Sequence, residues 1–178
     1  MTDPVLHEPW LSFLNDLDDV VEEETQLHCF GGFLVTQIYG SPRDTRDVDV
    51  ISIVPNNHSL IELAGKGSGL HKLHGIYLDK VGIATVPENY DDRLEEIFAG
   101  KFERLRLFAF DPYDVALAKI ERNLELDRAD VRFLAKTIPF DLDVLKKRYH
   151  DELRPYLAIP EREDLTLRLW VEMIEEER

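Results

Sequence analysis

The stretch that decides the fold is HCFGGFLVTQIYGSPRDTRDVDVI, residues 28–51. Gly31 and Gly32 separate a short apolar segment from FLVTQIYG, which ends at Gly40 as helices commonly do. The following DVDVISIVP, residues 47–55, is typical of a strand that a proline terminates. The order strand, glycine pair, helix, loop and acidic strand predicts an α/β core.

Asp47 and Asp49 stand two positions apart in the predicted strand, so their side chains share one face while Val48 and Val50 occupy the other. Two carboxylates on one face repel each other unless a cation lies between them. Carboxylate oxygens are the ligands that Mg²⁺ or Mn²⁺ prefers, and Mg²⁺ in such sites also binds the phosphates of a substrate. The pair therefore predicts a metal site.

The glycine pair and the loop before the acidic strand are candidates for binding phosphate. Without side chains, Gly31 and Gly32 let a phosphate approach the backbone N–H groups at a helix start. Arg43 can bind triphosphate oxygens, or it can pair with a neighbouring aspartate to hold the loop. Thr45 flanks the same strand, and for Arg46 a structural ion pair is the favoured interpretation.

The rest of the sequence alternates between helical and extended patterns as far as residue 110 and is helical afterwards. We expect two regions, a core over residues 1–110 and a helical extension over residues 111–178, which can also form one compact unit. Asp111 and Pro112 are typical of a helix start. Helices are predicted over 10–24, 33–40, 58–64, 88–98, 112–123, 127–136, 141–151 and 161–176. Strands are predicted over 26–30, 47–55, 75–86 and 102–110, with a flexible loop over 65–69.

The quoted stretch resembles the opening of the DNA-polymerase-beta-like nucleotidyltransferase superfamily, in which a Gly-Gly or Gly-Ser pair and a helix precede D-x-D. It is most similar to the small prokaryotic families related to AbiEii-type toxins. GIYLDKVGIATVPENYDDRL and FDPYDVALAKIERNLELDRADVRFLA resemble the same group, so the similarity covers residues 25–140. The implied fold is a mixed sheet with flanking helices, followed by a helical region.

The resemblance assigns roles to individual residues. Gly31 and Gly32 match the phosphate-loop pair, and Asp47 and Asp49 match the metal-binding carboxylates. Asp79 matches the third carboxylate, which ligates metal or acts as a base.

Further matches lie in the helical region. Lys119 matches a lysine that faces the triphosphate, and Asp127 and Asp130 match an acidic pair that follows it. For all three, the residues alone also allow a solvated helix face, a helix cap or ordinary ion pairs. One departure is that Gly32 stands where many active members have serine, which removes a hydroxyl contact to phosphate.

Composition limits the partners. The net charge of −15 argues against sequence-independent binding to nucleic acid, although a local groove with Lys101, Arg104 and Arg106 is conceivable. The acidic stretches at 16–24 and 175–177 are interpreted as solvated helix faces that can meet a basic partner. The single cysteine, Cys29, is expected to be a small core residue.

Localisation follows from the same features. A lone cysteine leaves no internal disulfide, and no apolar run approaches the roughly 18 residues of a membrane span. The start of the sequence also lacks the pattern of a signal peptide. We therefore expect a cytoplasmic protein without a membrane anchor.

Together these patterns predict an enzyme, a metal-dependent nucleotidyltransferase. It would pass a nucleoside monophosphate from a nucleoside triphosphate to an acceptor hydroxyl on tRNA, a protein or a small molecule, in a toxin-like role. Two alternatives remain: a non-catalytic binding module or antitoxin partner, which the Gly-Gly pair allows, and a two-metal nuclease, in which a glycine pair before a helix is less expected.

Overall fold

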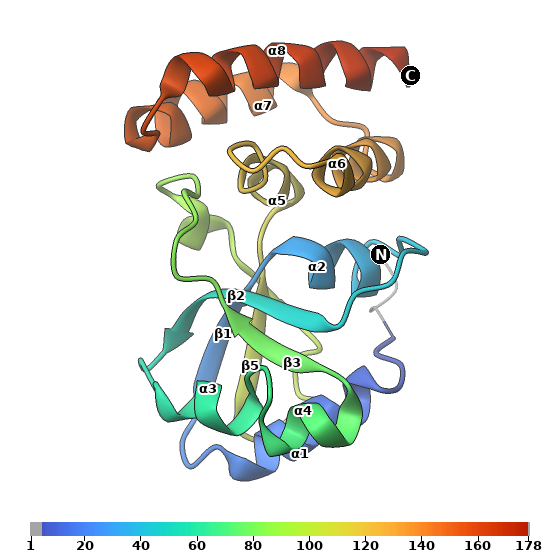
Figure 1. Cartoon of the computed structure of the whole chain (residues 1–178), viewed down its shortest axis with the longest axis vertical. Coiled ribbons are helices and arrows are strands. Elements are labelled where there is room, and N and C mark those ends of the chain that lie inside the picture. The colour runs from blue at the N-terminus through green and yellow to red at the C-terminus, as the bar shows by residue number, and fades with distance from the viewer. Residues whose placement is uncertain (1–4, 178) are drawn as a thin grey trace. The chain divides into compact units, whose positions relative to one another are not determined.

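The computed structural model describes residues 5–177 (Figure 1). The first four residues, on which the signal-peptide expectation partly rests, lie outside this range. The chain divides into two compact units. The first consists of Met1–Gly82 and Leu94–Phe110, and the second of Ile83–Arg93 and Asp111–Arg178. Each unit is described by itself below.

The first unit is built on a five-stranded sheet in the order β3-β2-β1-β5-β4. β1 pairs parallel with β5 and antiparallel with β2, β2 pairs parallel with β3, and β4 pairs antiparallel with β5. This mixed sheet confirms the predicted α/β fold class. The strands are β1 (Thr25–Cys29), β2 (Asp47–Val54), β3 (Tyr77–Lys80), β4 (Glu95–Ile97) and β5 (Leu105–Ala109).

Helices lie on both faces of this sheet, with α2 on the side opposite to α1 and α4 (Figure 1). They are α1 (Trp10–Val20), α2 (Gly31–Gln37), α3 (Ser59–Ala64) and α4 (Gly69–His74). The apolar positions at helical spacing in α1 are buried, among them Phe13, Leu14 and Leu17. In β1 the alternating pattern buries Leu27 and Cys29, which confirms the expectation that this cysteine is a core residue.

Two predicted elements between residues 75 and 98 are wrong. The strand expected over 75–86 pairs with β2 only at Tyr77–Lys80, and the chain then passes to the second unit at Ile83. The helix expected over 88–98 is a 3₁₀ turn (η1, Tyr90–Arg93) followed by strand β4. Pairing with β5 overrides the local helical preference there, because the ladder places Glu96 against the guanidinium of Arg106.

The loop expected over 65–69 is followed by a helix that the sequence did not reveal. Ser68 accepts a hydrogen bond from the backbone N–H of His71 and so caps α4. Gly75, at φ +71°, ends the helix in the left-handed conformation. A six-residue helix rich in histidine has too short an apolar pattern to stand out in the sequence.

The second unit is helical. It contains α5 (Pro112–Leu117), α6 (Glu125–Thr137), α7 (Leu142–Arg148), a π-helical turn (η2, Tyr149–Leu153), a 3₁₀ turn (η3, Arg154–Tyr156) and α8 (Pro160–Glu176). The predicted helix start is confirmed, since Asp111 accepts from the N–H of Tyr113 and Pro112 opens α5. This helix ends at Leu117, earlier than expected, and Lys119 lies in the turn that follows.

The segment Ile83–Arg93 is attached to these helices by a charged clamp. Arg93 donates to both oxygens of the fully buried Asp114, at 2.8 and 3.0 Å. It also donates to Glu152 at 2.7 Å. The N–H of Glu88 adds a backbone hydrogen bond to the carbonyl of Glu152. A bidentate Arg–carboxylate contact of this kind is among the stronger polar interactions in proteins.

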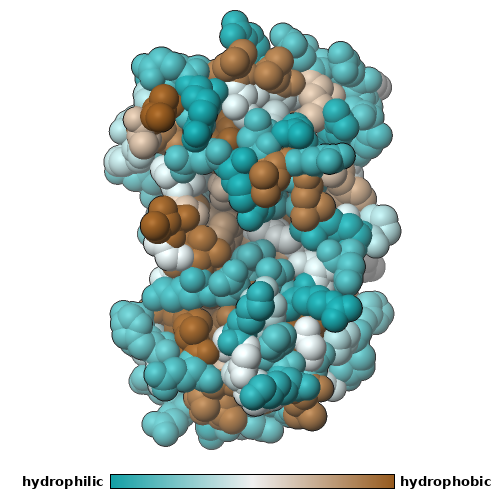
Figure 2. Space-filling view, in the orientation of Figure 1, coloured by the Kyte–Doolittle hydropathy of each residue, from teal (hydrophilic) through white to brown (hydrophobic). Residues whose placement is uncertain are grey.

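The surface is mostly hydrophilic on the face shown in Figure 2, and the apolar residues there form separate groups. Among the described residues, no helix has the length and apolar character needed to cross a membrane.

Asp18, in the acidic stretch near the N-terminus, makes hydrogen bonds inside the first unit. The carboxylate of Asp18 accepts from three successive backbone N–H groups, those of Glu103, Arg104 and Leu105, at 2.7–2.8 Å. Burial opposes ionisation, but these hydrogen bonds outweigh it and lower the pKa of Asp18 below its usual value near 3.8. Asp18 thereby joins α1 to the start of β5.

We expect Asp18→Ala to lower the free energy of unfolding by about 1–3 kcal/mol, because it leaves backbone donors without an acceptor. The control is Asp19→Ala, which removes the same charge from an exposed neighbouring position. Since the folded pKa of Asp18 is lowered, its contribution is present above about pH 4 and is lost as the pH falls through that folded value. Urea unfolding at pH 7 and at pH 3 measures both effects. Equal stability of the two variants at pH 7 would contradict this role.

Candidate active site

The three predicted carboxylates lie on two adjacent parallel strands. Asp47 and Asp49 are in β2, and Asp79 is the register partner of Asp49 in β3. Val48 and Val50 are fully buried on the other side of β2, so the apolar core fixes the direction of the acidic pair. One carboxylate oxygen from each aspartate lies within 4.8 Å of the others. The structure therefore brings together all three of these residues.

This spacing fits a divalent cation. Oxygen ligands stand about 2.0–2.6 Å from Mg²⁺ or Ca²⁺, so two ligands on opposite sides of one ion are about 4–5 Å apart. None of the three side chains is buried, which leaves room for water and substrate oxygens in the coordination shell. The role of these residues as metal ligands remains a prediction, but their chemistry and distances suit it.

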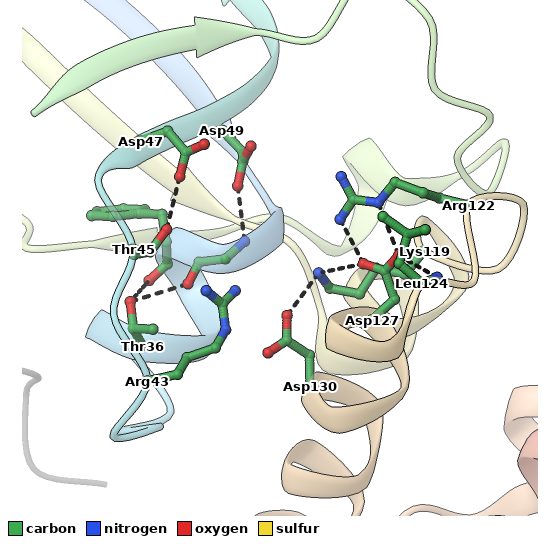
Figure 3. Close-up of polar contacts among 12 residues, drawn as sticks. Thr36, Arg43, Thr45, Asp47, Asp49, Lys119, Arg122, Leu124, Asp127 and Asp130 are labelled. Carbon is green, nitrogen blue, oxygen red and sulfur yellow. Dashed lines mark hydrogen bonds and ion pairs between the residues drawn. The ribbon is translucent and has the colours of Figure 1, made fainter.

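Hydrogen bonds hold two of the carboxylates in place (Figure 3). The hydroxyl of Thr45 donates to Oδ1 of Asp47 at 2.7 Å, and the N–H of Gly32 donates to Oδ2 of Asp49 at 2.8 Å. The hydroxyl of Tyr77 donates to Oδ2 of Asp47 at a longer 3.5 Å. Donors from three segments thus offset the repulsion between like charges.

The glycine pair is required by the positions of its neighbours. Gly31 has φ +66°, and a Cβ there would lie 2.2 Å from Oδ2 of Asp49. A Cβ on Gly32 would lie 2.4 Å from Nη2 of Arg43 and 3.1 Å from Oγ1 of Thr45. The absence of both side chains allows the start of α2 to pass directly against the acidic strand.

Arg43 and Arg46 differ in their surroundings. The guanidinium of Arg43 lies against Gly32 and donates to the backbone carbonyl of Asp44 at 3.0 Å. Arg46 pairs with the Asp44 carboxylate at 3.6 Å on an exposed surface. Gly32 and Thr45 therefore contact the acidic pair directly and Arg43 lies against Gly32, whereas Arg46 makes a structural ion pair. A phosphate-binding role for Arg43 stays a prediction.

Lys119, Asp127 and Asp130 form a buried charged cluster in the second unit (Figure 3). The ammonium of Lys119, which is only 4% exposed, lies 2.9 Å from Oδ2 of Asp130 and 3.5 Å from Oδ1 of Asp127. Arg122 and the N–H of Leu124 also donate to Asp127. The proposed contact of Lys119 with triphosphate stays a prediction; in this structure its ammonium is held between the two aspartates.

Asp127 is stabilised in its charged form. Burial opposes its ionisation, but the hydrogen bonds from Arg122 and from the Leu124 N–H lower its pKa below the usual value. The same carboxylate satisfies a backbone donor at the start of α6, which is the helix-cap role that its sequence position allowed.

Other candidates have structural partners. Nε2 of His74 pairs with Asp16 at 2.6 Å. Arg106 pairs with Glu96 and Glu24, and Arg104 donates to the Val21 carbonyl. Sequence reasoning missed Tyr77, although its i, i+2 spacing from Asp79 already placed both on one strand face.

The comparison with protein families matches residues 12–178 to the family described as "Nucleotidyltransferase of unknown function (DUF6036)". The chain belongs to this family. Comparison with curated proteins and with solved structures found no match. The narrower relationship to AbiEii-type toxins stays a prediction.

Substitution of the first glycine tests the geometry. Gly31→Ala places a methyl group against Asp49, so we expect a loss of Mn²⁺ binding as well as of stability. Gly40→Ala is the matched control, because Gly40 has a similar φ of +77° with open space around its Cα. Both variants should lose about 1–2 kcal/mol of stability from the backbone conformation. Calorimetric titration with Mn²⁺ should show weakened binding only for Gly31→Ala; equal Mn²⁺ affinities would contradict the packing argument.

Proposed function

We propose that this protein transfers a nucleoside monophosphate from a nucleoside triphosphate to an acceptor hydroxyl, with Mg²⁺ or Mn²⁺ bound by Asp47, Asp49 and Asp79. One observation carries the proposal: three carboxylate oxygens from adjacent strands lie within 4.8 Å of one another, in a chain of a nucleotidyltransferase family. In the reaction, the acceptor oxygen bonds to the α-phosphorus, and the bond to the leaving pyrophosphate breaks.

The bound ion would neutralise phosphate charge and lower the pKa of the attacking hydroxyl. The protein supplies positioning. Thr45 and Tyr77 fix the carboxylate of Asp47, and the Gly32 N–H fixes that of Asp49. Asp79 is the third carboxylate of the group, which ligates the ion or acts as the base that takes the acceptor proton.

The phosphates of the donor are assigned to the side of β2 where α2 begins. Gly31 and Gly32 present backbone rather than side chains there, and the Arg43 guanidinium lies against Gly32. A guanidinium is suited to bind phosphate oxygens in pairs, so Arg43 supplies the side-chain contact on this side. Thr45 acts mainly through Asp47, and its hydroxyl offers a further contact. This assignment does not need a serine at position 32.

The acceptor hydroxyl belongs to tRNA, a protein or a small molecule, and a toxin-like role with a partner protein is compatible with each. The rival proposal, a non-catalytic binding module, keeps the same fold without turnover. Metal-dependent binding of a nucleoside triphosphate followed by label transfer separates the two.

The test is incubation of the protein with nucleoside triphosphates labelled at the α-phosphate, Mg²⁺ and a cell extract. Asp47→Asn and Asp49→Asn should lower label transfer at least a hundredfold, because each removes a charged ligand of the ion. Asp44→Asn is the control, since Asp44 is close in sequence but its side chain is 82% exposed. Transfer that persists in both site variants, or that is unaffected by EDTA, would refute the proposed mechanism.

Lys119 is proposed as a further triphosphate ligand, with Asp127 and Asp130 supporting it. Because its ammonium is buried between two carboxylates, Lys119→Met leaves both without their shared cation. We therefore expect this variant to lose about 3–5 kcal/mol of stability rather than to fold normally. Arg122→Met, whose side chain is 62% exposed, should lose less.

Thermal unfolding measures the stability of both variants, and calorimetry at a temperature where both are folded measures binding of Mg²⁺–ATP. Weaker binding by Lys119→Met than by Arg122→Met supports the ligand role. Equal nucleotide affinities would leave Lys119 a structural residue only.

A further inference from the structure

Tyr77 adjoins the carboxylate triad on the side away from the glycine pair. It is the register partner of Asp47 in the parallel pairing of β2 with β3, and its hydroxyl reaches Oδ2 of that residue. The sheet order places β1 and β3 on opposite sides of β2. Because Gly31 follows β1 directly, Tyr77 and the glycine pair flank the acidic strand from its two sides.

Two more polar side chains contact the ring of Tyr77. The ammonium of Lys66 lies 5.7 Å from the ring centroid, a distance typical of a cation–π contact. The ring of His71 meets the same tyrosine edge-on, with centroids 5.0 Å apart. A lysine, a histidine and a tyrosine thus form one cluster beside the acidic triad.

Hydrogen bonds fix the conformation of the loop that carries Lys66. Gly67 adopts φ +90°, and its N–H donates to Nδ1 of His71 at 2.9 Å. Ser68 caps the following helix through the His71 N–H. These contacts fix the path of the loop and bring Lys66 to Tyr77.

The cluster is equipped to donate hydrogen bonds. Since Nδ1 of His71 accepts from a backbone N–H, the ring proton of the neutral imidazole is on Nε2, which makes Nε2 a donor. The Lys66 ammonium has three donor hydrogens and a positive charge, and it is exposed. Donors of this kind bind an anion, and phosphate is the anion they suit in a nucleotidyltransferase.

In-line displacement places the attacking oxygen and the leaving pyrophosphate on opposite sides of the α-phosphorus. If the donor phosphates lie toward Gly31 and Arg43, the acceptor approaches from the side of β3. Lys66, His71 and Tyr77 are on that side.

We propose that Lys66, His71 and Tyr77 form a phosphate-binding subsite for the acceptor. The acceptor is then a phosphate-bearing molecule, a nucleotide or the hydroxyl end of a nucleic acid, rather than a cationic antibiotic or an unmodified protein side chain. This inference rests on the proposed transfer reaction, and it agrees with a net charge of −15, because a local cation is needed to hold a phosphate on so acidic a protein.

The test measures donor and acceptor binding separately on the full-length protein by calorimetry. The donor probe is Mg²⁺ with a non-hydrolysable α,β-methylene analogue of ATP. With that analogue saturating, and again without it, the acceptor probes are AMP, a short ribo-oligonucleotide with a free 3′-hydroxyl, adenosine, and the aminoglycoside kanamycin. AMP and the oligonucleotide distinguish a mononucleotide from a nucleic-acid acceptor.

We expect AMP or the oligonucleotide to bind at least tenfold more tightly than adenosine or kanamycin. Lys66→Met should weaken that binding about ten- to hundredfold, the loss expected for one charge-assisted hydrogen bond. Lys66→Arg, which keeps the charge, should retain most of it. Lys72→Met removes the same charge from an exposed position on α4 and should have no effect. Donor affinity should be unchanged in all three variants.

The inference is overturned if adenosine binds as tightly as AMP and the oligonucleotide, or if Lys66→Met and Lys72→Met bind the phosphate-bearing probes equally. Failure of the proposed function has a different signature, namely no metal-dependent binding of the ATP analogue to the unmodified protein. Because the acceptor probes are also titrated without the analogue, the dependence on Lys66 is decided in either case.

Discussion

The repulsion between Asp47 and Asp49 is the constraint around which the first unit is arranged. Two carboxylates on one strand face are unfavourable by themselves, yet Val48 and Val50 leave the strand no other orientation. Hydrogen bonds from neighbouring segments compensate for this repulsion. The donors are the Thr45 hydroxyl in the preceding loop and the Gly32 N–H at the start of α2. The glycine pair, the loop and the strand are therefore one structural solution, and the spacing of its carboxylates suits a divalent cation.

In the second unit, buried carboxylates are paired with Lys or Arg side chains. Lys119 lies between Asp127 and Asp130, and Arg93 forms an ion pair with Asp114. Each of these three buried carboxylates therefore has a positively charged side chain beside it. Such pairs seldom add stability over apolar packing, but they are costly to break one partner at a time. The helical unit is therefore sensitive to single charge substitutions at these residues.

The sequence was sufficient where the deciding pattern is local. The run from residue 28 to residue 51 contains its own turns and faces, so a helix at the glycine pair and the acidic face of β2 could be predicted. The helix was predicted over 33–40, whereas α2 spans Gly31–Gln37. The structure of residues 88–98 was not predicted correctly, because the pairing of β4 with β5, rather than the local helical preference, decides the path of this segment.

The cluster of polar side chains on Tyr77 was missed because it, too, depends on tertiary structure. Lys66, His71 and Tyr77 each look ordinary in the sequence, and only the turn at Gly67 and the parallel register of β3 bring them together beside the aspartates. The third carboxylate was identified through resemblance, while its structural partner across the ladder, Asp49, became apparent only from the strand pairing.

The path of the chain has a consequence for how this protein can be divided. Ile83–Arg93 belongs to the helical unit but lies between two parts of the sheet unit, so the polypeptide passes from one unit to the other three times. A cut after Phe110 would leave Asp114 in the helical fragment without its partner Arg93. The sheet fragment would keep Ile83–Arg93 without the helices that this segment packs against. We therefore expect neither piece to fold as a self-sufficient module.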